Sequence, residues 1–140
     1  MENIKLSKLS VIGAGQIGTD ILLHFAKVLA EKKVQLVLVD ISETALQNAR
    51  KKIEKKIAKG VEVLALAPAL ADTMKNCIKY SLHYSDIAGS EIVLEAATES
   101  EPVKDKIFKQ AESLCSESTI FLSNSSHMQP EVIFRNIKNE

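Results

Sequence analysis

The sequence predicts an α/β fold, in which a mainly parallel sheet is covered by helices on both faces. Short apolar runs, typical of buried strands, alternate along the chain with longer amphipathic stretches, typical of helices. Such alternation favours parallel pairing through right-handed crossovers. A glycine-rich turn at residues 11–18 joins the first strand to the first helix, which is typical of a Rossmann-type doubly wound sheet. The 140 residues are 46% apolar and contain no repeat or linker, so residues 1–140 are expected to form one domain.

The expected elements follow from this alternation in order. We expect strands at an apolar run that ends at Ile12, and at residues 34–39, 78–81, 92–95 and 119–122. We expect helices from the glycine-rich turn to about Lys32, from about Ser42 to Gly60, from Pro68 to about Met74, and from Pro102 to about Cys115. Residues 61–67 fit several conformations, and residues 86–90 are turn-like. This order places the ligand outside the carboxyl ends of the strands.

Composition excludes several classes of protein. Lysine plus arginine and aspartate plus glutamate number 18 each, and this zero net charge argues against a nucleic-acid-binding surface. The two cysteines, Cys77 and Cys115, lack metal-ligand spacing, so we expect buried thiols in a reducing compartment and no metal site. The charged start and the lack of a long apolar segment predict neither a signal peptide nor a membrane span. We therefore expect a cytoplasmic protein.

The glycine-rich turn matches the fingerprint of dinucleotide-binding proteins. Gly13 permits a tight turn from strand to helix, Gly15 lets the backbone approach a pyrophosphate, and Gly18 allows close packing of the helix on the strand. Gln16 and Ile17 lie in the first turn of the expected helix, where free N–H groups face the phosphates. A packing role alone is the alternative for these glycines, and a methyltransferase glycine loop is the main similar motif.

Asp40 strengthens the fingerprint. It ends the second expected strand and lies 22 residues after Gly18, the offset of a carboxylate that binds an adenosine ribose. The alternative is that Asp40 only caps the helix that begins near Ser42. A carboxylate with no neighbouring arginine would repel a 2′-phosphate, so the sequence predicts NAD rather than NADP as the cofactor.

Three segments carry a resemblance to a known family. Residues 11–18, Glu95-Ala96-Ala97-Thr98-Glu99 and Ser123-Asn124-Ser125-Ser126 together resemble the NAD-binding domain of 3-hydroxyacyl-CoA dehydrogenases, over essentially the whole chain. The resemblance implies hydride transfer between NAD and C3 of a 3-hydroxyacyl-CoA, so an acyl-CoA is the expected substrate.

The resemblance also implies roles for single residues. Glu99 and Lys104 would line the nicotinamide half of the cofactor site, Ser126 would bind the substrate's 3-oxygen, and Asn124 would shape the same loop. One of three lysines in the second helix would hold the coenzyme A end: Lys52, Lys56 or Lys59. The alternatives are that Glu99 and Lys104 are ordinary charges at a helix start, and that residues 123–126 are only a polar turn.

The chain departs from the family pattern at two points. Asp20 replaces a common glycine in the helix that faces the pyrophosphate, where an inward carboxylate would repel a phosphate. The family's catalytic histidine and its helical domain both lie beyond the equivalent of Glu140. His127 follows Ser126 directly, but adjacent side chains in an extended segment point to opposite faces, so we do not expect it to be the base.

We therefore expect this chain to be the amino-terminal NAD-binding domain of a longer enzyme. The domain alone is expected to be inactive, and the whole enzyme is expected to dimerise through its second domain. The alternatives are a stand-alone NAD(H)-binding sensor or partner subunit without catalysis, and a dehydrogenase of another hydroxy acid. A reading frame that continues past residue 140 into a helical region with an early histidine would favour the NAD-binding domain of a longer enzyme over these alternatives.

Overall fold

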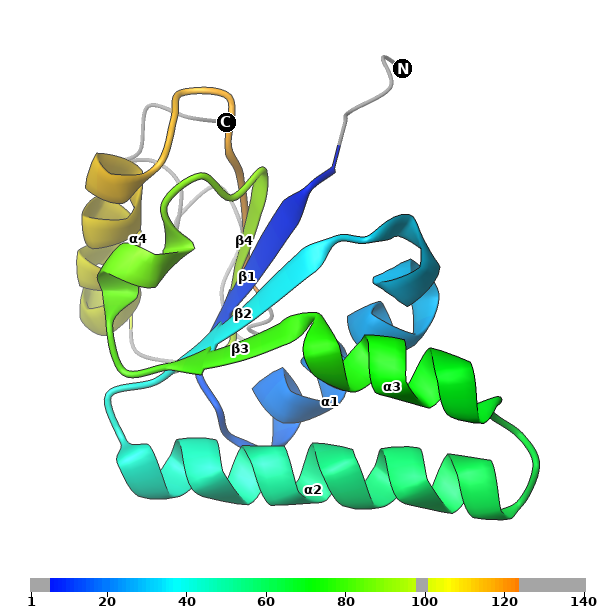
Figure 1. Cartoon of the computed structure of the whole chain (residues 1–140). Helices are drawn as coiled ribbons and strands as arrows, with labels where there is room; N and C mark the ends of the chain where they lie inside the picture. The colour runs from blue at the N-terminus through cyan, green and yellow to red at the C-terminus, as the bar shows by residue number, and fades with distance from the viewer. Residues whose placement is uncertain (1–5, 98–100, 124–140) are drawn as a thin grey trace.

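The computed structural model describes residues 6–97 and 101–123 and contains a five-stranded sheet in the order β3-β2-β1-β4-β5 (Figure 1). The strands are β1 Lys8–Ile12, β2 Gln35–Val39, β3 Ile78–Ser81, β4 Ile92–Glu95 and β5 Ile120–Ser123. All four pairings are parallel. This order, which reverses between β1 and β4, is that of a Rossmann-type sheet and confirms the predicted fold class.

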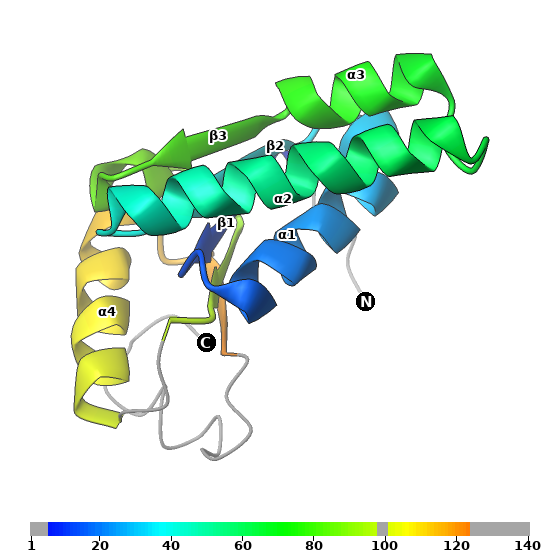
Figure 2. The ribbon, with the colours of Figure 1, turned by 90° about the horizontal axis from the view of Figure 1, so that it is seen from below.

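Helices cover both faces of the sheet (Figures 1 and 2). They are α1 Gln16–Leu29, α2 Glu43–Glu62, α3 Pro68–Asn76 and α4 Glu101–Leu114, with short 3-10 turns at η1 Ala30–Lys32 and η2 Tyr84–Ile87. Helices α1, α2 and α3 cover one face, and α4 covers the other together with η2. Along β2, Leu36 and Leu38 face the first group, whereas Val37 and Val39 face the second, as the two-residue period of a strand requires.

The end of α2 corrects one expectation. The helix was expected to stop at Gly60, but it continues to Glu62, and the chain reverses at Leu64, which has a φ of 61°. The carbonyl oxygen of Gly60 accepts hydrogen bonds from the amides of Ala65 and Leu66. A Cβ at position 60 would lie 3.2 Å from the Cβ of Leu66, so the glycine makes room for the returning chain rather than ending the helix.

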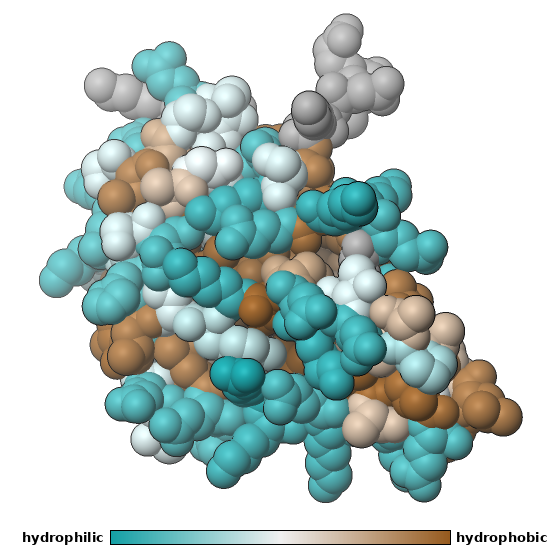
Figure 3. All heavy atoms as spheres, in the orientation of Figure 1, coloured by the Kyte–Doolittle hydropathy of each residue, from teal (hydrophilic) through white to brown (hydrophobic). Residues whose placement is uncertain are grey.

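The connection between α2 and α3 carries exposed apolar side chains. Val63 is 57% exposed and Leu64 is 92% exposed. Figure 3 shows apolar residues gathered at this end of the molecule, whereas hydrophilic residues cover much of the rest of the same face. Within residues 6–97 and 101–123, no helix is both long enough and apolar enough to cross a membrane.

Candidate functional site

The glycine-rich turn lies at the carboxyl end of β1, beside the point where the strand order reverses. Gly13 has a φ of 110°, and its amide donates to the carbonyl oxygen of Val39 at 2.8 Å. A Cβ at Gly18 would lie 1.9 Å from the carbonyl oxygen of Gly13, which no side chain tolerates. In contrast, a Cβ at Gly15 would meet nothing within 4 Å. Gly13 and Gly18 therefore serve the turn itself, whereas the surface at Gly15 is open to a ligand.

Helix α1 presents its amino terminus at this open surface. Gln16 is its first residue, and Gly15, Gln16 and Ile17 are exposed, Ile17 to 57%. The first turn of a helix has N–H groups without partners inside the helix, and they attract anions. No acidic residue lies in that first turn. The turn is therefore suited to a pyrophosphate.

Asp40 follows β2 and contacts both neighbouring segments. Its Oδ2 accepts a hydrogen bond from the amide of Ala14 at 2.8 Å, and its Oδ1 accepts one from the amide of Ser42 at 2.8 Å. Ser42 is itself the N-cap of α2, because its Oγ accepts from the amide of Ala45 at 3.1 Å. The alternative that Asp40 caps this helix is therefore wrong. Each carboxylate oxygen can accept a further hydrogen bond, which leaves room for the two hydroxyls of a ribose.

A groove of about 450 Å³ opens beside Asp40. Its lining combines the ends of β1 and β2 with residues from η2, from the segment after β4 and from α4: Ile12, Gly13, Val39, Asp40, Ile41, Tyr84, Ala97, Val103, Lys106, Ile107 and Gln110. Two of its apolar side chains are unusually open to solvent, since Ile41 is 82% exposed and Val103 is 45% exposed. An apolar slot next to a ribose-binding carboxylate fits the flat ring of an adenine.

Tyr84 lies in this groove, and its phenol has a raised pKa. Burial raises the pKa of its phenol, and the negative charges of Asp40 and Glu95 raise it further. Tyr84, Ile41 and Val103 were not among the residues predicted for the site. The one available signal was Ile41, an apolar residue between two polar ones, directly after a strand end.

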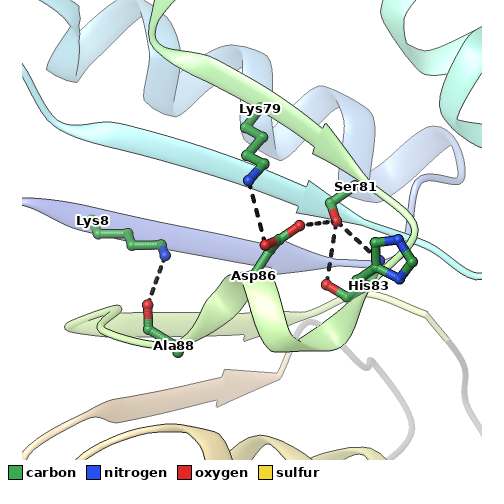
Figure 4. Close-up of polar contacts among 6 residues, drawn as sticks. All are labelled: Lys8, Lys79, Ser81, His83, Asp86 and Ala88. Atoms are coloured by element: carbon green, nitrogen blue, oxygen red, sulfur yellow. Dashed lines mark hydrogen bonds and ion pairs between the residues drawn. The ribbon is translucent and has the colours of Figure 1, made fainter.

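A polar network at the end of β3 holds the segment that carries Tyr84 (Figure 4). Ser81 Oγ donates to the carboxylate of Asp86 and accepts from the amide of His83 at 2.9 Å. Lys79 Nζ lies 3.3 Å from Asp86 Oδ1. The bond from Ser81, together with the charge of Lys79, lowers the pKa of Asp86. This network fixes the turn after β3, and the carbonyl oxygen of Ser81 accepts from the amide of Asp40 at 3.1 Å.

Several residues that the resemblance implicates cannot be placed. Glu99, Asn124, Ser126 and His127 lie outside the described residues. Lys104 lies on α4, but its side chain is also outside the described part. Ser123, the last residue of β5, is paired in register with Glu95 of β4. Ser123 therefore lies at the same edge of the sheet as the glycine-rich turn.

The orientation of Asp20 was left open by the sequence, and the structure shows its partners. Its carboxylate does not point toward the phosphate side of the turn but contacts α2, with Oδ1 lying 2.9 Å from Lys52 Nζ and 3.4 Å from Lys56 Nζ. The hydrogen bond from Lys52 is the main cause that lowers the pKa of Asp20. Two of the three lysines proposed for coenzyme A are thus paired with Asp20, and the third, Lys59, is exposed.

Replacement of Asp20 by asparagine is therefore expected to leave the affinity for NADH within about twofold, because its carboxylate contacts lysines of α2 and a partly exposed ion pair between α1 and α2 contributes at most about 1 kcal/mol to stability. Calorimetric titration measures this. A matched control is Asp72→Asn, which removes a surface ion pair with Lys75 on α3. A clear tightening with the Asp20 variant alone would place its carboxylate close to the phosphates.

The strand order, the open glycine-rich turn and the oriented carboxylate define a dinucleotide-binding α/β domain. The family model described as 3-hydroxyacyl-CoA dehydrogenase, NAD binding domain, matches residues 8–140. The chain thus belongs to the 3-hydroxyacyl-CoA dehydrogenase family and corresponds to its NAD-binding domain, so NAD is its cofactor.

Individual relatives agree with this assignment. The chain is 35% identical over 129 residues to the fatty acid oxidation complex subunit alpha of Shewanella halifaxensis, covering 91% of this chain and 18% of that protein. It is 30% identical over 142 residues to a probable 3-hydroxyacyl-CoA dehydrogenase of Caenorhabditis elegans, covering 97% of this chain and 45% of that protein. The chain thus spans less than half the length of either relative.

Solved structures give the same result. The 3-hydroxybutyryl-CoA dehydrogenase of Escherichia coli superposes with a TM-score of 0.88 at 28% identity, covering 97% of this chain and 28% of that one. The (S)-3-hydroxybutyryl-CoA dehydrogenase of Ralstonia eutropha superposes with a TM-score of 0.85 at 29% identity, covering 94% of this chain and 45% of that one. The family membership predicted from the three sequence segments is therefore confirmed.

Proposed function

We propose that this chain holds NAD(H) in the groove at the carboxyl edge of the sheet, as the cofactor-binding part of an enzyme that oxidises 3-hydroxyacyl-CoA. The observation that carries the proposal is Asp40, whose two oxygens are oriented by the amides of Ala14 and Ser42 directly beside the glycine-rich turn. Bound NAD would accept the hydride from C3 of the substrate.

Each part of the cofactor has a counterpart in the site. The pyrophosphate would lie against residues 13–18, where Gly15 is open and the N–H groups of Gln16 and Ile17 begin α1. The ribose hydroxyls would donate to the carboxylate of Asp40. The adenine would occupy the part of the groove that Ile41 and Val103 line, which would account for two exposed large apolar side chains there.

The reacting half of the site is proposed from the family resemblance. Glu99 and Lys104 would face the nicotinamide, Ser126 would bind the substrate's 3-oxygen, and Asn124 would shape that loop. The pairing of Ser123 with Glu95 supports this, because Ser123, which directly precedes Asn124 in the sequence, lies at the edge of the sheet that carries the glycine-rich turn. The base that takes the hydroxyl proton would come from elsewhere in a longer protein, whose second domain would also form a homodimer.

For the coenzyme A end of the substrate, Lys59 is the candidate that Asp20 leaves unpaired. A cytoplasmic location is part of the same proposal.

The cofactor preference tests the proposal. Calorimetric titration should show NADH binding at least about tenfold more tightly than NADPH, because Asp40 accepts hydrogen bonds from a 2′-hydroxyl and repels a 2′-phosphate. In Asp40→Ala the preference should disappear, whereas in Glu43→Ala, at an exposed residue in the first turn of α2, it should persist. Equal or tighter binding of NADPH by the parent chain would remove Asp40 from its role.

A further inference from the structure

Glu95 is the one charged side chain that is fully buried within the described part of the chain, with 0% of its surface exposed. It is the last residue of β4 and is paired in register with Ile12 of β1 on one side and Ser123 of β5 on the other. A buried carboxylate costs considerable free energy unless it accepts strong hydrogen bonds. Its presence at the carboxyl edge of the sheet therefore requires an explanation.

The carboxylate holds the backbone of the segment that follows β4. Glu95 Oε2 accepts a hydrogen bond from the amide of Ala97 at 2.6 Å. The preceding amide, that of Ala96, donates to the carbonyl oxygen of Ile12 at 2.8 Å. Two successive amides are thus fixed, one by the end of β1 and one by the side chain of Glu95.

This fixed segment forms a wall of the cofactor groove. A Cβ at Gly13 would lie 2.8 Å from three backbone atoms of Ala96 and Ala97, so the glycine-rich turn packs directly on this part of the chain. Ala97 also lines the groove together with Gly13 and Asp40. A displacement of Ala97 by a fraction of an ångström would change both the turn and the groove.

We propose that Glu95 is a positioning residue for the dinucleotide, whose buried carboxylate locks the backbone of Ala97 against the glycine-rich turn and so keeps the groove in its binding shape. The proposal rests on the cofactor location given above. It assigns to Glu95 no contact with the cofactor. The charge of Glu95 also reaches the groove, since it contributes to the raised pKa of Tyr84.

Two variants of the full chain separate the length of the side chain from its charge. Glu95→Asp keeps the charge but is one methylene shorter, so it loses the bond to Ala97. Glu95→Gln keeps the length, and its amide oxygen can still accept from the same N–H, though more weakly without the charge. The dissociation constant of NADH is measured by calorimetry, and exchange of the Ala97 amide hydrogen is measured by NMR without ligand.

Glu91 provides a matched control at the other end of β4. Its Oε1 accepts hydrogen bonds from the amides of Ser7 and Lys8, each at 2.8 Å, and it is absent from the groove. Glu91→Gln therefore perturbs a comparable carboxylate that joins β1 to β4. It reports what a purely structural defect does to NADH binding.

We expect Glu95→Asp to speed exchange of the Ala97 amide and to weaken NADH binding by about tenfold, the scale of one hydrogen bond to a charged group. Glu95→Gln should fall between this variant and the parent, and Glu91→Gln should bind NADH as the parent does. If Glu95→Asp does not fold, the glutamine variant decides by the same two measurements.

Two results would overturn the proposal: NADH binding within twofold of the parent in the folded Glu95 variant, or weaker binding with unchanged exchange at Ala97. Failure of the parent chain itself to bind NADH would instead contradict the proposed function, because the exchange measurement involves no cofactor.

Discussion

Gly18→Ala is expected to weaken NADH binding by up to about 100-fold. The added Cβ would lie 1.9 Å from the carbonyl oxygen of Gly13, so the turn would have to open, at a cost of roughly 1–3 kcal/mol for overpacking. The strain falls on the same backbone that would hold the pyrophosphate. Calorimetric titration with NADH and a thermal melt of the same sample measure the two effects, and both affinity and melting temperature should fall.

Gly15→Ala is the matched control for this prediction. A Cβ at Gly15 would meet nothing within 4 Å, so this variant should melt at the temperature of the parent. Its NADH affinity should nevertheless fall, because the methyl group would occupy the surface that the pyrophosphate approaches. Parent-like NADH affinity in Gly18→Ala would show that the turn adapts and is not the phosphate site.

The sequence predicted the fold, and its local signals pointed to four residues that the structure brings together at one edge of the sheet. Strands such as 34–39 and 92–95 are short apolar runs, and their alternation with helices leads to parallel pairing without any knowledge of distant contacts. The same holds for the dinucleotide-binding motif, because it lies within one strand-helix-strand unit: the spacing of Gly13, Gly15 and Gly18 and the offset of Asp40 can be read from neighbouring residues. The structure places all four at the same edge of the sheet.

Features created by contacts between distant segments were not predicted. The sequence left open whether the Asp20 carboxylate faces the phosphates, because its partners Lys52 and Lys56 lie on the next helix, more than 30 residues later in the chain. Similarly, no periodic pattern shows that Ile41 and Val103, which lie on different elements, both remain exposed in the lining of one groove. Gly60 was expected to end the helix, because the residues next to it in the sequence do not show that the chain turns back and brings Leu66 against it.

The described half of the site also explains what the chain is expected to lack. Residues 13–18 and Asp40 can hold a hydride acceptor, but alcohol oxidation also requires a base for the hydroxyl proton. General-base catalysis typically contributes about 10²–10⁴-fold, and orientation of the substrate by a second domain is a further large term. A chain that supplies only cofactor binding therefore falls several orders of magnitude short.

We accordingly expect the 140-residue chain to bind NADH, seen as a change in nicotinamide fluorescence, and to show no measurable oxidation of 3-hydroxybutyryl-CoA. Ser126→Ala should bind NADH as the parent does, because that hydroxyl is assigned to the substrate's oxygen. If a longer protein with a helical second domain oxidises this substrate, the sensor alternative is excluded for that protein, and Ser126→Ala should lower its turnover. If the 140 residues alone oxidise the substrate and His127→Ala abolishes this turnover, His127 is the base. That result would contradict the proposal that this chain supplies only cofactor binding and that the base comes from elsewhere in a longer protein.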